Sequence, residues 1–313
     1  MQTKPVRIGT RGSKLAVAQA EETRARLMQA HNLQQHDFEI VVISTEGDRI
    51  QDRALSEVGG KGLFTEDIES RLLDGSVDIA AHSSKDMPNE LPQNLVLSTF
   101  LPREDVRDAF ISNKYKTLDD MPIGSVLGTS SLRRQAIVKS LRPDLKIVIY
   151  RGNVQTRLRK LEEGVADATL LACAGLRRLN NDHLITNALE TEQFLPAVGQ
   201  GAICLEVNEN NAPILKLLTA INDQVTMDEL TLERAFLGDL DGSCRTPIAG
   251  LARVEGNEIS FRGQILLPDG TENHFVTIRG SRADVVKLGR EAASQLKEIA
   301  GPEFLEKLAQ QMV

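Results

Sequence analysis

The chain has 313 residues, 41% of them apolar, so roughly two or three domains can each bury a core. Its 44 acidic residues outnumber the 37 basic ones, and the net charge of -7 argues against a protein that binds nucleic acid or a membrane surface. The three cysteines are too widely spaced for a disulfide framework, and since no Cys/His pair has zinc spacing, no metal is expected.

The first third of the chain alternates strand patterns with helix patterns. In chain order the sequence predicts a strand over Val6–Thr10, a helix from about Ser13, a strand over Phe38–Thr45, a helix marked by Phe64, Ile68 and Leu72 and ended by Gly75, and a strand over Val77–Ala81. Such alternation predicts a parallel sheet with crossover helices.

The same order recurs further on. The predicted strands are Ser125–Thr129, Leu145–Tyr150 and Ala168–Ala172, and the predicted helices are Leu132–Leu141 and Val154–Glu163. In both regions a strand ends in Gly-Thr, at Thr10 and Thr129, and an Asp follows a helix-ending Gly by three residues, at Asp78 and Asp167. Two matches in the same order suggest two lobes of similar design, although Gly and Ser are common at any strand–helix junction.

The last part of the chain has a different pattern. Segments near Leu101–Glu104 and Leu195–Val198 are candidate hinges, and a strand over Ile203–Val207 could return to the first lobe. Beyond them we expect a helix over Asp228–Leu240, antiparallel strands over Ile248–Val254, Glu258–Leu266 and Phe275–Arg279, and a closing helix over Ala283–Ala300.

Arginines and hydroxyls gather at the predicted strand–helix junctions. Arg133 and Arg134 follow Thr129-Ser130-Ser131 at a helix start, where unpaired amides favour an anion. Arg11 and Ser13 repeat this arrangement in the first lobe, and Arg151 follows a strand. Ligands of open α/β sheets bind at the carboxyl ends of strands, so we expect a small polyanion there. A solvated helix face is the alternative for any single Arg, more so for Arg157 than for the residues at junctions.

His82-Ser83-Ser84-Lys85-Asp86-Met87-Pro88 follows a predicted strand and offers several reactive groups. Pro88 disfavours helix at Met87, so we expect an extended loop. A fixed carboxylate at Asp86 among Arg side chains could stabilise a cation that develops in a ligand. The alternative is a turn or N-cap aspartate.

Cys244 lies in a Gly-Ser-Cys turn between a predicted helix and a predicted strand. A thiol on such a turn is exposed enough to react. The alternative is a small apolar residue that closes the helix. Cys173 and Cys204 lie in apolar, strand-like runs and are expected in the core.

Together these segments resemble the porphobilinogen deaminase (hydroxymethylbilane synthase) family over nearly the whole chain. The blocks that carry the resemblance, in the family's order, are Gly59–Phe64, His82–Pro88, Gly128–Gln135, Arg151–Val154, Leu195–Gly201 and the Glu233–Ala249 attachment signature. Ser84 and Ser243 stand where the family tolerates other small or apolar residues.

The resemblance implies an α/β fold with two periplasmic-binding-protein-like lobes, their sheets mainly parallel, and a smaller C-terminal α+β domain. The implied domains are lobe 1 over 1-101 and 202-219, lobe 2 over 107-195, and a C-terminal domain over 224-313 that carries Cys244. A monomer is expected.

The resemblance also implies the chemistry. Such an enzyme condenses four porphobilinogen units head to tail, releasing ammonia each time, on a dipyrromethane cofactor bound to Cys244 by a thioether. Asp86 is the implied catalytic residue. The residues implied to hold cofactor carboxylates are Ser83, Lys85, Thr129, Ser131, Arg133, Arg134, Arg151 and Arg157. Those implied to face the substrate are Arg11, Ser13, Lys61, Phe64, Arg178 and Gln200.

A rival interpretation is a non-catalytic two-lobed anion receptor. It explains the paired lobes and the arginines, but not Cys244, Asp86 or the third domain. The first residues lack the apolar segment of a signal peptide, and no apolar run approaches the roughly 20 residues that cross a bilayer. We therefore expect a soluble, cytoplasmic protein.

Overall fold

The computed structural model describes residues 4–45, 65–240 and 246–312. The chain divides into two compact units. Unit 1 comprises residues up to 104 together with 201–227, and unit 2 comprises 105–200 together with 228–313. The chain thus passes between units next to both predicted hinges. This division separates lobe 1 from the rest of the chain and does not divide lobe 2 from the C-terminal domain. The boundaries of three domains therefore stay a prediction.

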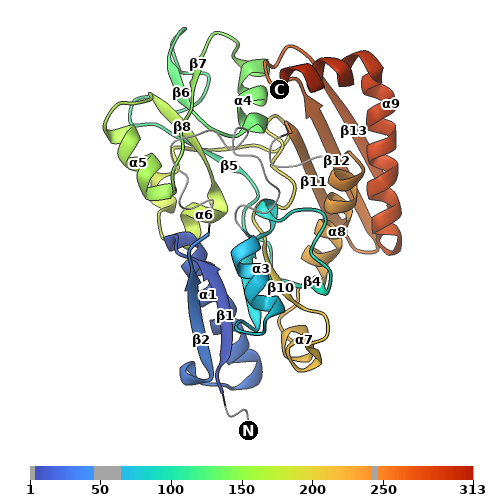
Figure 1. The fold of residues 1–313 in the computed structure, drawn as a ribbon. Helices are drawn as coiled ribbons and strands as arrows, with labels where there is room; N and C mark the ends of the chain where they lie inside the picture. Colours follow the sequence, from blue (N-terminus) through green and yellow to red (C-terminus); the bar gives the residue numbers. More distant parts are fainter. Residues whose placement is uncertain (1–3, 46–64, 241–245, 313) are drawn as a thin grey trace. The chain divides into compact units, whose positions relative to one another are not determined.

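The sheet of unit 1 has the strand order β2-β1-β3-β10-β4 (Figure 1). Its strands are β1 (Val6–Arg11), β2 (Phe38–Ile43), β3 (Ile79–Ser83), β4 (Leu95–Phe100) and β10 (Ile203–Asn208). β1 runs parallel to β2 and β3, whereas β10 runs antiparallel to β3 and β4. The predicted return of the chain to the first lobe is therefore confirmed, and four of the five strands share one direction.

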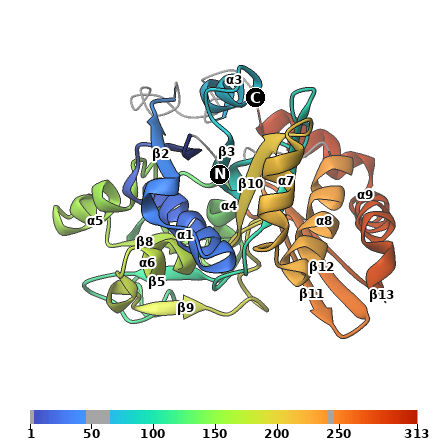
Figure 2. The ribbon, with the colours of Figure 1, turned by 90° about the horizontal axis from the view of Figure 1, so that it is seen from below.

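Helices cover both faces of this sheet. α1 (Lys14–His31) and α7 (Ala212–Thr219) share one apolar cluster, and Figure 2 shows α7 beside β10. α3 (Glu66–Leu73) packs on the other face through Ile68 and Leu72. Successive side chains of a strand point to opposite faces of the sheet. Ala81 of β3 therefore belongs to the first cluster, whereas its neighbour Ala80 belongs to the second.

The second sheet, in unit 2, repeats this plan with the order β7-β6-β8-β5-β9. Its strands are β5 (Asp108–Ile111), β6 (Val126–Gly128), β7 (Lys146–Val148), β8 (Ala168–Ala172) and β9 (Asn187–Leu189). Here β5 is the strand of opposite direction, as β10 is in unit 1. α4 (Leu132–Leu141) covers one face, and α5 (Val154–Glu162) and α6 (Cys173–Arg178) cover the other.

A third sheet, also in unit 2, is the antiparallel meander of β11 (Ile248–Glu255), β12 (Glu258–Leu266) and β13 (Asn273–Ser281). α8 (Gln224–Asp239) and α9 (Val285–Gln311) pack against it (Figure 1). The closing helix was predicted to end at Ala300, and its helical backbone does break at Gly301, after which a second helical segment runs to Gln311. The φ of Gly301 is 74°, a value at which glycine avoids the clash of a Cβ atom.

The α/β fold with two mainly parallel sheets and an α+β end is confirmed. Among the α-helices and strands of the described residues, those without a predicted counterpart are β4, β5, β9, α6 and α7. Among the described helices, none is both long and apolar enough to span a membrane.

Candidate active site

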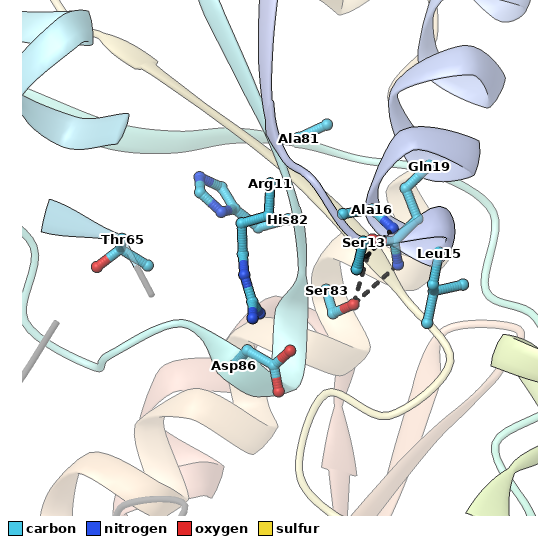
Figure 3. Close-up of a pocket in the computed structure, with 10 residues that line it drawn as sticks. All are labelled: Arg11, Ser13, Leu15, Ala16, Gln19, Thr65, Ala81, His82, Ser83 and Asp86. Atoms are coloured by element: carbon cyan, nitrogen blue, oxygen red, sulfur yellow. Dashed lines mark hydrogen bonds between the residues drawn. The ribbon is translucent and has the colours of Figure 1, made fainter. Parts of the chain in front are cut away.

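A pocket in unit 1 opens at the carboxyl ends of β1 and β3 (Figure 3). The residues that line it are Arg11, Ser13, Leu15, Ala16, Gln19, Thr65, Ala81, His82, Ser83 and Asp86. Ser13 caps α1, because its hydroxyl accepts a hydrogen bond of 3.2 Å from the backbone N–H of Ala16. The structure therefore brings together four of the predicted site residues: Arg11, Ser13, Ser83 and Asp86.

Asp86 is exposed at the end of a short 3-10 turn, Ser84–Asp86, that follows β3 directly. Figure 3 shows the side chain of Arg11 extending toward the Asp86 carboxylate. The prediction of an extended loop was wrong for Ser84–Asp86, which form the turn, whereas Met87 before Pro88 is extended as predicted. β3 runs through Ser83, and the turn that follows is closed by the Met87 N–H bonded to the Ser84 carbonyl.

The hydroxyl of Ser83 is held by Gln19, a residue that sequence reasoning missed. Gln19 Nε2 donates to Ser83 Oγ at 2.8 Å, and only 3% of Gln19 is exposed. A polar residue within the inward stripe of α1 was the available signal. Lys85 is half-buried on the turn next to Ser83.

A buried polar group backs this pocket. His82 Nε2 lies 3.1 Å from Glu206 Oε2, and the Glu206 side chain is fully buried. Glu69 of α3 is buried close by, and burial raises its pKa, with the negative charge of Glu206 adding to the rise and a hydrogen bond from Thr65 opposing it. Sequence reasoning missed both carboxylates. Glu206 could have been found as the one charged residue of an apolar strand.

In unit 2, two predicted arginines converge on a buried carboxylate, Asp108, at the start of β5. Arg134 Nε and Nη2 bind Asp108 Oδ1 at 2.8 and 2.6 Å, and Arg133 Nη2 lies 2.8 Å from Asp108 Oδ2. Burial alone would raise the pKa of Asp108, but Arg133 and Arg134 outweigh it and lower the pKa to about 2. Gln200, which is 1% exposed, donates from Nε2 to Asp108 Oδ1 at 3.2 Å and to the Val106 carbonyl at 2.7 Å.

Two buried guanidinium nitrogens of unit 2 can still donate a hydrogen bond. Among the described residues, Arg133 Nε and Arg151 Nη1 are buried without a hydrogen-bond partner. Buried N–H groups are rarely left unsatisfied, so each of these two nitrogens suits a carboxylate oxygen of a ligand. Thr129 and Ser131 stand at the same helix start, where the Ser131 hydroxyl accepts from the Arg134 N–H at 3.5 Å.

The remaining predicted residues divide into three groups. Arg157 donates from Nε to the Gly152 carbonyl at 2.9 Å, and Arg178 ends α6 half-buried. Cys173 and Cys204 are buried as expected, and burial raises the pKa of the Cys173 thiol to about 12. The predicted site residues that lie outside the described residues are Cys244, Lys61 and Phe64.

Two family models and one curated relative match most of this chain. The family model for porphobilinogen deaminase, dipyromethane cofactor binding domain, matches residues 6–216, and the model for the porphobilinogen deaminase C-terminal domain matches 227–298. A porphobilinogen deaminase of Nitrobacter hamburgensis is 57% identical over 297 residues, which cover 95% of this chain and 94% of that protein.

Similar solved structures include a periplasmic substrate-binding protein of an ABC transporter from Coxiella burnetii. It is 17% identical, with 71% of this chain and 94% of that chain covered at a TM-score of 0.43. The methionine binding protein MetQ is 13% identical, with 70% and 90% covered at a TM-score of 0.45. On the two family models and the close relative, this chain belongs to the porphobilinogen deaminase family.

Proposed function

We propose that this protein joins four porphobilinogen units head to tail, with loss of one ammonia for each, and releases the linear tetrapyrrole hydroxymethylbilane. The convergence of Asp86, Arg11, Ser13 and Ser83 on one pocket carries the proposal. Membership of the porphobilinogen deaminase family supports it.

Three residues of this pocket, Arg11, Ser13 and Asp86, have a physical role in the proposed reaction. The acetate and propionate groups of porphobilinogen suit Arg11 and the N-terminus of α1 at Ser13. Loss of ammonia leaves a cation on the pyrrole ring of the substrate, and a preorganised carboxylate at Asp86 stabilises that cation more than it stabilises the uncharged ring of bound porphobilinogen. The side chain of Arg11 extends toward Asp86, so a cation and a carboxylate lie together in the pocket.

A dipyrromethane primer fits the arginines of unit 2. When bound, it supplies the nucleophilic pyrrole carbon that the first substrate unit joins. Its carboxylates would pair with Arg151 and Arg133, each of which has one buried guanidinium nitrogen without a hydrogen-bond partner among the described residues. The other residues proposed to hold the primer are Ser83, Lys85, Thr129, Ser131, Arg134 and Arg157, and those proposed to help bind substrate are Lys61, Phe64, Arg178 and Gln200.

The primer is proposed to be attached through Cys244. Both other cysteines are buried, and a thiol with a pKa of about 12 at Cys173 is a poor nucleophile. We further propose a cytoplasmic monomer without a nucleic-acid or membrane partner, to which the net charge of -7 lends support.

Ammonia release tests the proposed reaction directly. The protein is incubated with porphobilinogen, and ammonia and tetrapyrrole are measured together. We expect one ammonia for each porphobilinogen consumed and one tetrapyrrole for every four. Binding of porphobilinogen without ammonia release would favour the receptor.

A further inference from the structure

Asp108 is a buried acid that holds two of the proposed primer-binding arginines. It is 0% exposed, and each of its carboxylate oxygens faces a different guanidinium. We propose that Asp108 is a positioning residue, which fixes Arg133 and Arg134 in the orientation that binds a primer carboxylate. The inference rests on the proposed function.

Helix geometry shows why such a residue is needed. Arg133 and Arg134 are consecutive on α4, and consecutive helical side chains point about 100° apart. One carboxylate nevertheless receives both guanidiniums. A backbone carbonyl then fixes each of them, because Arg133 Nη1 donates to Leu195 at 2.8 Å and Arg134 Nη1 donates to Leu170 at 2.9 Å.

The charges of this cluster point to an anionic ligand. Two guanidiniums and one carboxylate leave an excess of one positive charge, with Arg133 and Arg134 4% and 6% exposed. Burying an uncompensated charge is costly, and the Nε of Arg133 is also unsatisfied among the described residues. A ligand carboxylate would supply both the missing charge and the missing acceptor.

The hydrogen bonding between strands that the two sheets have in common does not require an acidic residue at position 108. The N–H of Ser84 donates to the Ala202 carbonyl, and the N–H of Cys173 donates to the Arg107 carbonyl, each at 3.0 Å. The residues that follow these carbonyls are therefore equivalent, and they are Ile203 in unit 1 and Asp108 in unit 2. Since the apolar Ile203 occupies this position in unit 1, the strand pairing does not require a carboxylate there. The carboxylate of Asp108 therefore acts on Arg133 and Arg134.

Loading of the primer tests this role. Full-length protein is produced in cells that make no porphobilinogen, porphobilinogen is added, and intact mass follows loading over time. Asp108→Asn removes the charge and keeps the shape, and Asp108→Glu keeps the charge at a displaced position. The matched control is Asp167→Asn, which removes another carboxylate bonded to the same sheet. All variants are compared below their melting temperatures.

We expect Asp108→Asn to load roughly 10–100-fold more slowly than wild type, which is the range typical when a residue that orients a metal-binding side chain is lost. Asp108→Glu should fall between them, and Asp167→Asn should load normally. Normal loading by folded Asp108→Asn overturns the proposal. If Asp108→Asn does not fold, Asp108→Glu decides, since normal loading by that variant also overturns it. A wild-type protein that never loads contradicts the proposed function itself.

Discussion

Asp78 and Asp167 make the same hydrogen bond in the two parallel sheets. The carboxylate of Asp78 accepts from the backbone N–H of Arg7 at 2.8 Å, and that of Asp167 accepts from the N–H of Val126, also at 2.8 Å. Each carboxylate also pairs with a cation, Arg7 for Asp78 and Lys114 for Asp167. The repeated aspartates in the sequence therefore mark one structural device used twice.

Equivalent roles predict equivalent losses. Asp78→Asn and Asp167→Asn should each lower the free energy of unfolding by about 1–3 kcal/mol. Each variant loses charged hydrogen bonds between one strand and the loop that leads into the neighbouring strand of the sheet. Denaturant unfolding measures both. Glu303→Gln, on the exposed surface of α9, should change stability by less than about 0.5 kcal/mol. A loss confined to one of the two aspartates would show that their roles differ.

The elements that the sequence predicted best depend on local pattern. α4, β8 and β12 have their predicted limits, because a helical or strand period and a clear boundary residue coincide there. β5 was missed, since it is only four residues long and begins with a charged residue. Asp108 can be buried in a strand because Arg133 and Arg134, far along the chain on α4, reach it.

The same contrast holds for the site. Arg11, Ser13, Ser83 and Asp86 could be predicted to converge, because the carboxyl ends of neighbouring parallel strands share one edge. The His82–Glu206 pair joins residues 124 positions apart on antiparallel strands, and no local pattern indicates such a contact.

Asp108 predicts a specific loss of stability in acid. Its pKa is about 2 in the folded protein and 3.8 as the reference value, so the folded state binds its proton less readily. Its contribution is fully present above about pH 4 and is lost as pH falls toward about 2, and it amounts to about 2 kcal/mol. Wild type should lose most of this amount beyond what Asp108→Asn loses when denaturant unfolding is compared at about pH 5 and pH 2.5. Equal losses would mean that Asp108 is not held by its arginines.

The two groups of arginines should fail at different stages. Losing one charged hydrogen bond costs roughly 1.5–3 kcal/mol. Arg151→Leu should therefore hinder primer assembly, whereas Arg11→Leu should keep the primer and block elongation. Intact mass before and after porphobilinogen is added separates these outcomes. Normal elongation by Arg11→Leu would exclude Arg11 from the substrate site.

Asp86→Asn should separate catalysis from binding. It keeps the shape of the side chain but loses the charge that stabilises the substrate cation, so single-turnover rates should fall at least roughly 10²-fold. Because Asp86 is exposed, the variant should melt close to wild type and carry its primer. Asp86→Glu should retain some activity. A primer-loaded Asp86→Asn protein that reacts at the wild-type rate would make Asp86 a turn residue only.

The mass of the purified protein tests the central claim most directly, namely that a primer on Cys244 carries the growing chain. Wild type should exceed its sequence mass by one dipyrromethane, located on the peptide that contains Cys244, and should gain up to four pyrrole units when porphobilinogen is added. Cys244→Ala should lack the adduct, whereas Cys173→Ala and Cys204→Ala, which alter buried thiols, should keep it. An active wild-type protein at its bare sequence mass, or an adduct that survives Cys244→Ala, would contradict the account.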